Sequence, residues 1–504
     1  MSSIANIFFN NAERSPEKTA IWCDGETITY KELSSFVKKW SNLLNSNNVK
    51  YGEHIGVLLP NNIEFVALML VASNIGAAIV PLNPTLPASA IELAFNSSDV
   101  KHVIGITSSM ETLNKENLKD ATGFCLSIDD ENEEPNSFIN LIKNSPETPI
   151  TGTKIFGSEA LILTLTSGST GEPKPIVLTQ KNKIDRAHAA CELYSVTSED
   201  KILAATPLYH SLAERLVLMP LLIGATSILM PRFSPSMWLK CVKEQEVSFT
   251  IAVSSQLSQI AELLASPFLP EINSLRCIVS SSALLENHIK YELLAKLKCD
   301  FHECYGASEI AIATNLNIVD SKTKLKSVGK AAPNVDVKIL KEDGTFANAG
   351  EAGEIICKTP MLFGGYYKLP ELTKSAMFGD YFCTGDLGKL DEDGFLTFLD
   401  RKKDLIITGG INVYPKDVET VIAQLPEIEE CVAISIPDDR LGEVVAVALV
   451  SKKGQEINLK TVKFHCAKCL ADFQQPRKYF IIEKLPRNAM GKLTKHALVE
   501  QLTT

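Results

Sequence analysis

Several features that mark specialised classes of protein are absent from this sequence. Basic residues are in the minority, since 50 Lys and Arg face 60 Asp and Glu and the net charge at pH 7 is −10. That balance argues against nucleic acid or an anionic membrane as the main partner, and it allows an anionic small ligand only where positive charge is concentrated locally. No repeat of fixed period is present, and 45% apolar with 22% charged residues is ordinary for a globular protein.

A disulfide framework is also absent. The twelve cysteines are scattered without regular spacing, which suits a reducing compartment and predicts a cytoplasmic protein. The segment HCAKC offers His465, Cys466 and Cys469, but no second pair of ligands lies near it in the sequence. Because structural zinc sites use four ligands, we interpret this segment as ordinary helix and not as a metal site.

Uninterrupted apolar runs of membrane-spanning length are lacking too. The first residues show no basic start followed by an apolar run, so no signal peptide is expected. The most apolar stretch, 65–82, is interrupted by Asn74 and Gly76, which predicts a buried helix followed by a buried strand and no transmembrane segment. The run 216–231 repeats this arrangement with its break at Gly224. Alternating helix and strand predicts a large α/β fold.

The length of 504 residues is too great for a single core and predicts two or three domains. Apolar strands alternate with amphipathic helices over 151–330, whereas 331–400 has the short strands and turns of a β-rich subdomain. The charged segment DRKKD, 400–404, is a candidate hinge. We therefore predict a large N-terminal domain, 1–400, of stacked α/β subdomains plus the β-rich subdomain, and a small mobile α/β C-terminal domain, 401–504.

The segment LTLTSGSTGEPKP, 163–175, is rich in hydroxyls and glycine and lies between two apolar runs. It is a candidate phosphate-binding loop, and the alternative is a solvated hairpin. It is not a Walker A motif, because prolines flank its lysine and remove two backbone donors. Anion binding would then depend on the hydroxyls of Thr166, Ser167, Ser169 and Thr170. Gly168 and Gly171 would let the backbone bend close to the anion, and Lys174 would add one mobile positive charge.

The stretch TSGSTGEPKP resembles the phosphate loop of the adenylate-forming (AMP-binding) superfamily, which includes acyl-CoA synthetases, stand-alone adenylation domains and luciferases. Companion motifs occur in the family's order and spacing, so the resemblance spans essentially the whole chain: PLYH (207–210), YGASE (305–309), YFCTGDLG (381–388), DRKKDLIITGGINVYPKDVE (400–419) and LPRNAMGK (485–492). It implies an enzyme that uses ATP and Mg²⁺ to convert a carboxylic acid to acyl-AMP and then passes the acyl group to coenzyme A. The C-terminal motifs look particularly like those of malonyl-CoA synthetases.

The resemblance implies roles for the residues of YGASE. Tyr305 would stack on adenine, and Gly306 would let the backbone approach the nucleotide. Ser308 keeps a hydroxyl for phosphate where the family more often has threonine. Glu309 would be the magnesium carboxylate, and one carboxylate with phosphate oxygens and waters suits Mg²⁺.

The same resemblance implies which residues bind the ribose and which lysines supply positive charge in the first half-reaction. Asp386 would accept both ribose hydroxyls, and Arg401 would also touch the ribose. Lys492 would be delivered to the first half-reaction, where it adds to the positive charge of Lys174.

Two further segments resemble those that serve the second half-reaction. Lys403 matches the pivot about which the C-terminal domain rotates, which would let one site serve two steps. Gly409 and Gly410 match the loop that comes forward for thioester formation.

The acyl pocket is expected to include His210, Ser281, Ser282 and Ala307, and the small residues after PLYH favour a small or aliphatic acid. Glu214 and Arg215 follow them. We expect this pair to bond with neighbours, which favours a monocarboxylic, fatty acid; the alternative is that Arg215 anchors a second carboxylate.

Other functions remain open at this stage. A carrier-protein thiol could replace CoA as acceptor, a malonate-type dicarboxylate ligase shares the same motifs, and a luciferase-type oxidase is a third alternative. A catalytically silent nucleotide-binding paralogue is the non-enzymatic one. A homodimer is also open.

Overall fold

The protein is described here by a computed structural model. It describes residues 2–113, 117–118, 123–129, 137–150, 155–167, 173–265, 272–283, 285–324, 326–487 and 493–503. The chain forms two compact units, Met1–Val337 with Cys357–Phe382, and Lys338–Ile356 with Cys383–Thr504. The division into 1–400 and 401–504 stays a prediction.

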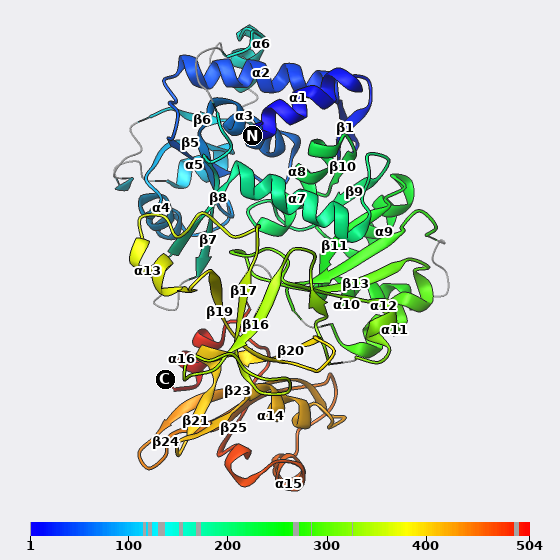
Figure 1. Cartoon of the computed structure of the whole chain (residues 1–504), viewed down its shortest axis with the longest axis vertical. Helices are drawn as coiled ribbons and strands as arrows, with labels where there is room; N and C mark the ends of the chain where they lie inside the picture. The colour runs from blue at the N-terminus through cyan, green and yellow to red at the C-terminus, as the bar shows by residue number, and fades with distance from the viewer. Residues whose placement is uncertain are drawn as a thin grey trace. The chain divides into compact units, whose positions relative to one another are not determined.

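The first unit contains a six-stranded sheet in the order β6-β5-β3-β4-β7-β8; β5, β6, β7 and β8 are labelled in Figure 1. Its strands are β3 (His54–Leu58), β4 (Ala78–Pro81), β5 (Val100–Gly105), β6 (Cys125–Ser127), β7 (Ala160–Ser167) and β8 (Pro173–Thr179). All neighbours are parallel except β7 and β8. The apolar run 65–82 forms α3 (Ile63–Ile75), which ends at Gly76 in the left-handed conformation and leads into β4. The predicted helix followed by a strand is confirmed there.

A nine-stranded sheet, ordered β15-β14-β13-β12-β11-β9-β10-β1-β2, forms the rest of this unit's framework. Its strands are β1 (Thr19–Cys23), β2 (Glu26–Thr29), β9 (Lys201–Ala204), β10 (Thr226–Leu229), β11 (Phe249–Val253), β12 (Cys277–Ser281), β13 (Asp300–Tyr305), β14 (Thr314–Asn317) and β15 (Lys330–Ala331). From β1 to β13 the neighbouring strands are parallel. The run 216–231 again gives a helix, α8 (Ser211–Ile223), a left-handed Gly224 and a buried strand, as predicted.

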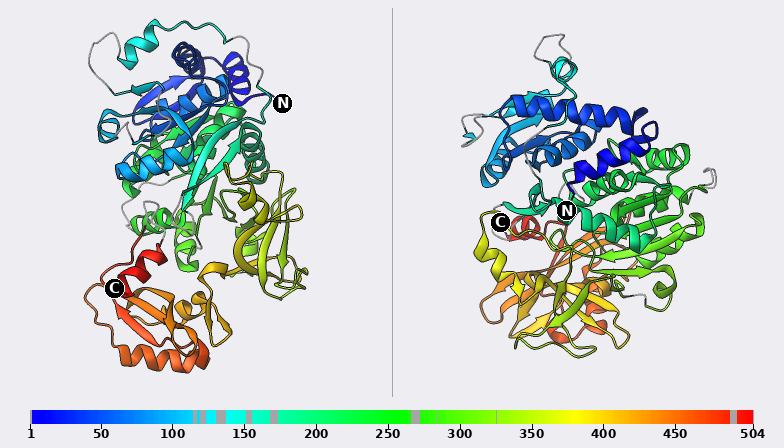
Figure 2. Two further views of the ribbon diagram at one scale, coloured as in Figure 1. Left: turned by 90° about the vertical axis from the view of Figure 1, so that its left-hand side faces the viewer. Right: turned by 45° about the horizontal axis from the view of Figure 1, so that its top comes forward.

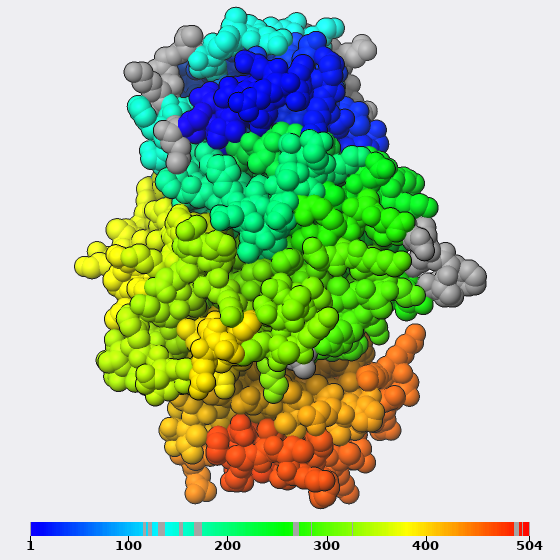
Figure 3. Space-filling view, turned by 45° about the vertical axis from the view of Figure 1, so that its right-hand side comes forward, coloured from blue at the N-terminus to red at the C-terminus, as the bar shows by residue number. Residues whose placement is uncertain are grey.

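Helices cover these sheets. They are α1 (Ile4–Arg14), α2 (Tyr30–Ser46), α4 (Ala88–Ser97), α5 (Thr107–Thr112), α6 (Phe138–Asn144), α7 (Gln180–Tyr194), α9 (Pro235–Glu244), α10 (Ser254–Leu264), α11 (Asn287–Lys296), α12 (Ile318–Ser321) and α13 (Pro370–Ser375). Helices α1, α2 and α6 gather at one end of the unit (Figures 1 and 2). There the Trp40 and Phe138 rings pack edge to face with centroids 4.9 Å apart. The first residues form a continuous patch of that surface (Figure 3).

The region 331–400 contains the five-stranded sheet predicted as β-rich. Its strands are β16 (Asp336–Leu340), β17 (Gly353–Lys358), β18 (Met377–Phe378), β19 (Tyr381–Leu390) and β20 (Leu396–Arg401). A 3₁₀ turn, Lys402–Asp404, follows β20.

The remaining residues of the second unit form a mixed sheet with helices. Its elements are β21 (Ile406–Thr408), β22 (Ile411–Val413), α14 (Pro415–Ile422), β23 (Ile428–Asp438), β24 (Gly442–Ser451), α15 (Leu459–Cys469), a 3₁₀ turn Asp472–Gln474, β25 (Lys478–Ile481) and α16 (Lys495–Thr503). Alternate residues of β24 point to opposite faces. Val445 and Val447 join one apolar cluster, and Val444 and Ala446 join another. Both faces of this sheet are therefore covered.

Two sequence interpretations can be compared directly with these elements. HCAKC lies at the end of α15 as predicted, where the His465 ring lies 3.1 Å from the carbonyl oxygen of Val421. Within the described part of the chain, no cluster of three or more His, Cys, Asp or Glu is arranged to hold a metal ion. Among the described helices, none combines the length and apolar character needed to cross a membrane.

Candidate active site

The candidate phosphate loop connects two antiparallel strands of the first unit. In the register of β7 and β8, Thr166 lies opposite Lys174 and Ser167 opposite Pro173. The far edge of β8 is tied to a later segment, because the amide of Tyr367 donates to the carbonyl of Pro175 at 2.9 Å. The strands thus hold the two ends of the loop in place. The predicted phosphate ligands between them lie outside the described residues: Gly168, Ser169, Thr170 and Gly171.

YGASE begins at the carboxyl end of β13. After Tyr305 the chain makes a tight turn in which a Cβ atom at Gly306 would lie 1.8 Å from the carbonyl oxygen of Ala311. The turn is closed by the amide of Ala311, which donates to the carbonyl of Ala307 at 2.8 Å. Glycine is therefore needed at 306 for the chain's own backbone, whatever its part in nucleotide binding. Tyr305 and Ser308 are half-buried at this turn.

Glu309 is held on two sides. Its carboxylate oxygen Oε1 accepts a hydrogen bond from the Tyr366 hydroxyl at 3.0 Å. Its carbonyl oxygen accepts bonds from Arg186 Nη2 at 2.9 Å and from the amide of Phe363 at 2.8 Å. Burial and the nearby Glu309 raise the pKa of Tyr366, so the phenol stays a donor at neutral pH. The carboxylate of Glu309 is thereby oriented before any ion arrives.

Arg186 and Tyr366 were missed by the sequence analysis. Arg186 is buried in α7, where it also donates to the carbonyl of Met361 from Nε at 3.2 Å and from Nη2 at 3.0 Å. Along α7 it lies on the same face as Ala190, one turn later, which is buried. A cation within an apolar helical stripe is the signal that could have revealed it, because buried charges require partners.

His210 is the N-cap residue of α8 and its side chain makes no capping bond. Its Nε2 atom is buried and has no hydrogen-bond partner among the described residues. Burial lowers the pKa of His210 to about 4, so the imidazole is neutral at pH 7. A neutral, unpartnered imidazole can exchange hydrogen bonds with a bound substrate.

The strand order brings His210 near the other predicted pocket residues. His210 follows β9, Ser281 ends β12 and Ala307 follows β13, and all three strands are parallel members of one sheet. Their carboxyl ends meet at one edge, which is where α/β sheets bind ligands. The Ser281 side chain bonds to the Cys304 side chain. Ser282 has a φ of 77°, a strained value for serine.

The predicted ribose pair lies in the second unit. Asp386 and Arg401 are direct partners in the β19–β20 register, and Arg401 Nε lies 3.1 Å from Asp386 Oδ1. Asp386 is buried, while the side chain of Arg401 is 42% exposed. A cavity of about 380 Å³ next to them is lined by Thr384, Gly385, Arg401, Lys402 and Lys403. The predicted ribose arginine and pivot lysine thus share one cavity.

The link that contains Lys403 is anchored by a residue that the sequence analysis did not single out. The buried Asp400 accepts bonds from the amide of Arg401 at 2.8 Å and from the amide of Lys416, in the first turn of α14, at 3.1 Å. Aspartate is a favoured acceptor at a helix start. The carboxylate therefore ties the end of β20 to the start of α14.

Gly409 and Gly410 form the turn between β21 and β22, where Thr408 pairs with Ile411. Their φ values of 56° and 80° are both positive. A two-residue hairpin of this kind strongly favours glycine. Lys492, the predicted adenylation lysine, lies outside the described residues.

His210 and Glu309 follow strands of the nine-stranded sheet, and the phosphate-type hairpin joins β7 and β8 of the six-stranded sheet. This arrangement can be compared with known proteins. Residues 8–367 match the AMP-binding enzyme family, and residues 417–492 match the AMP-binding enzyme C-terminal domain. The chain belongs to the AMP-binding enzyme family.

Individual relatives resemble the chain over nearly its whole length. It is 29% identical to a long-chain-fatty-acid–CoA ligase of Mycobacterium tuberculosis, over 94% of this chain and 93% of that protein. It is 30% identical to a 2-succinylbenzoate–CoA ligase of Bacillus cereus, over 99% of this chain and 98% of that protein. The structure of ATP-bound MatB of Rhodopseudomonas palustris matches this chain with a TM-score of 0.89 at 28% identity. The match covers 99% of this chain and 98% of MatB. The o-succinylbenzoate CoA synthetase of Bacillus subtilis in complex with ATP and magnesium has a TM-score of 0.86 at 28% identity, with 98% and 99% covered.

Proposed function

We propose that the protein is an ATP-dependent carboxylic acid–CoA ligase that acts on a fatty or other aliphatic acid. The supporting observation is that His210, Ser281 and the Tyr305–Glu309 turn lie at or after the carboxyl ends of parallel strands of one sheet. The CoA ligases among its full-length relatives point the same way.

The proposed reaction has two steps. A carboxylate oxygen of the acid attacks the α-phosphorus of ATP, the bond to pyrophosphate breaks, and acyl-AMP forms. The sulfur of CoA then attacks the acyl carbon, the bond to AMP breaks, and the thiol proton is released. Since the first step brings two anions together, it depends on positive charge and fixed alignment. Lys174, Arg401 and Lys492 are the proposed sources of that charge.

Other side chains have proposed binding roles. Glu309, held by Tyr366, fits a Mg²⁺ site that uses one protein carboxylate with phosphate oxygens and waters, and Mg²⁺ would neutralise phosphate charge there. Tyr305 takes the adenine, Asp386 takes the ribose hydroxyls, and His210 lies between the acid and the thiol. The phosphate ligands are Thr166, Ser167, Gly168, Ser169, Thr170, Gly171 and Ser308, and Gly306 lets the backbone approach the nucleotide.

The remaining proposals concern the rotation of the C-terminal domain, the thiol acceptor, the compartment and the assembly. The C-terminal domain, 401–504, rotates about Lys403 between the two steps, and the Gly409–Gly410 turn serves the second. The acceptor is CoA; a carrier-protein thiol is the alternative. The protein acts in the cytoplasm, and a homodimer is its proposed assembly.

The decisive experiment measures acid-dependent exchange of pyrophosphate into ATP against a panel of acids, with and without CoA. We expect exchange that depends on the acid and on Mg²⁺, and release of AMP with acyl-CoA once CoA is added. Exchange without any thioester product would favour the carrier-protein alternative. Nucleotide binding without exchange for any acid would identify a silent paralogue.

A further inference from the structure

A short segment, 363–368, pairs with the outer edge of β8, and we refer to it as the strap. β8 lies at one end of the strand order of the six-stranded sheet. Besides the bond from the Tyr367 amide, the amide of Gly364 donates to the carbonyl of Val177 at 2.8 Å, and the amide of Val177 donates to the carbonyl of Gly365 at 3.0 Å. Edge strands need such partners for their backbone groups. The strap is thereby fixed to the strand on which the phosphate-type hairpin ends.

The strap also holds Glu309, which follows β13 of the other sheet. Its first residue, Phe363, donates its amide to the Glu309 carbonyl at 2.8 Å, and the Tyr366 hydroxyl donates to Glu309 Oε1 at 3.0 Å. The backbone of Tyr366 pairs with Ile176 in β8. The Tyr366 ring packs edge to face against Phe363 with centroids 4.9 Å apart, which restricts the direction of the phenol. Tyr366 therefore touches both the hairpin strand and the carboxylate.

The next residue of the strap serves a different carboxylate. The Tyr367 hydroxyl donates to Asp99 Oδ2 at 2.7 Å, and Lys368 forms an ion pair with the same Asp99. The two neighbouring phenols thus bond to two acidic residues, of which only Glu309 belongs to the candidate active site.

A hydrogen bond to a metal-binding carboxylate fixes the orientation in which that carboxylate meets the ion. We infer that the strap couples the phosphate-type hairpin to the metal carboxylate, and that Tyr366 is the positioning residue through which it does so. The inference rests on the proposed function, in which the hairpin holds phosphate and Glu309 holds Mg²⁺. ATP and Mg²⁺ should therefore strengthen each other's binding through this segment.

The test is calorimetry of ATP binding in Mg²⁺ and in EDTA, with AMP in EDTA as the reference that needs no metal. No acid is added, so no adenylate forms. The ratio of the two Kd values for ATP measures the coupling to Mg²⁺. Tyr366→Phe should lower this ratio by about tenfold, the size expected for losing a partner of a metal ligand. The Kd values for AMP and for ATP in EDTA should stay unchanged.

Gly365→Ala disturbs the strap at its other attachment. Gly365 has a φ of 106°, which favours glycine, and a Cβ atom there would lie 3.2 Å from Thr373 Cγ2. This variant should also lower the ratio. Combined with Tyr366→Phe it should lower the ratio no further than the stronger single variant, because both act through one path.

Tyr367→Phe is the matched control. It removes the same atom from the adjacent residue, whose phenol bonds to Asp99, and it keeps the amide that pairs with β8. The ratio should equal that of the wild type.

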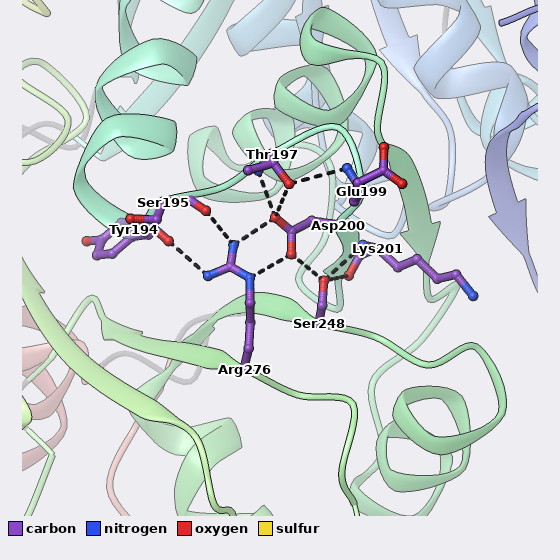
Figure 4. A network of polar contacts seen from close by, with 8 residues as sticks. All are labelled: Tyr194, Ser195, Thr197, Glu199, Asp200, Lys201, Ser248 and Arg276. Atoms are coloured by element: carbon purple, nitrogen blue, oxygen red, sulfur yellow. Dashed lines mark hydrogen bonds and ion pairs between the residues drawn. The ribbon is translucent and has the colours of Figure 1, made fainter.

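Arg276→Met controls for a general loss of stability. Arg276 donates from Nε and Nη2 to the two carboxylate oxygens of Asp200, both at 2.7 Å, in a separate network of the same unit (Figure 4). It also bonds to the carbonyls of Tyr194 and Ser195. This variant should lower the thermal midpoint and leave the ratio unchanged.

Three results would overturn the inference: wild-type ATP binding that Mg²⁺ does not strengthen, a wild-type ratio in Tyr366→Phe, and equal losses in Tyr366→Phe and Tyr367→Phe. A wild type that binds neither ATP nor AMP would refute the proposed ligase function itself. Hydrogen exchange of the Phe363 amide, which donates to Glu309, then decides about the strap. Faster exchange in Tyr366→Phe than in Tyr367→Phe supports the positioning role, and equal exchange refutes it.

Discussion

The two units each carry an arginine next to an acidic residue, and the two pairs behave differently. In the second unit, Arg401 is 42% exposed and makes an ion pair with Asp386, its neighbour across two strands. In the first unit, Arg215 is 8% exposed, and the adjacent Glu214 pairs with Lys183 from another helix. Water screens the first pair and leaves its arginine available to a ligand. Burial makes the second arrangement sensitive to the loss of any one charge. Burial, more than residue type, therefore separates a binding surface from a charged core.

The difference between the buried Glu214 pair and the partly exposed Arg401 pair is most directly tested by the stability of variants. Glu214→Gln should lower the free energy of unfolding by about 3–5 kcal/mol, because Lys183 would remain buried without its counterion. Arg401→Met should change it by less than about 1 kcal/mol, since the pair it breaks is partly exposed. Urea denaturation of both variants measures the difference. Similar losses in the two variants would contradict the contrast between the units.

The largest catalytic effect is expected at Lys492. A unit charge about 4 Å from another contributes roughly 4 kcal/mol at an effective dielectric of 20, which is on the order of a thousandfold in rate. Lys492→Ala should therefore slow acyl-adenylate formation by about two to three decades and slow thioester formation from synthetic acyl-adenylate only severalfold. Quenched-flow assays of each half-reaction give the two rates.

Lys403→Pro is the companion variant, because it should restrict the pivot and slow whichever step requires rotation. Near wild-type rates for Lys492→Ala would mark Lys492 as a solvated surface lysine. Equal, large losses in both steps would point to misfolding or to a single fixed pose.

A smaller effect is expected for nucleotide affinity. Asp386→Ala removes a charged acceptor from the ribose, and a hydrogen bond to a charged group contributes roughly 1.5–3 kcal/mol, so the Kd for AMP should rise about tenfold or more. Calorimetry with AMP measures this change. Unchanged AMP affinity in a folded variant would remove Asp386 from the nucleotide site.

The smallest effect concerns pH. The folded protein holds the pKa of His210 at about 4, below the usual 6.5, because of burial, so the unfolded chain binds more protons between those values. Stability should therefore rise with pH through that window and fall by about 1–2 kcal/mol from pH 8 to pH 5. His210→Gln should reduce this dependence, as thermal unfolding across pH 4.5–8 would reveal. A variant with the wild-type pH profile would argue against a buried neutral imidazole.

The sequence by itself determined the features whose physical cause is local. An apolar run broken by a glycine predicted helix α3 followed by strand β4, and likewise α8 followed by β10. The chain can leave the helix there because Gly76 and Gly224 adopt the left-handed conformation. The motif YGASE located Gly306, although its need for glycine comes from the carbonyl of Ala311. The tertiary structure decided what depends on packing between distant segments. Lys183, 31 positions away in the sequence, takes the carboxylate of Glu214, and Arg186 reaches the carbonyl of Glu309, 123 positions away. The sequence predicted only that Glu214 and Arg215 bond with neighbours, and only the packing of α7 against α8 showed that the partner of Glu214 is Lys183.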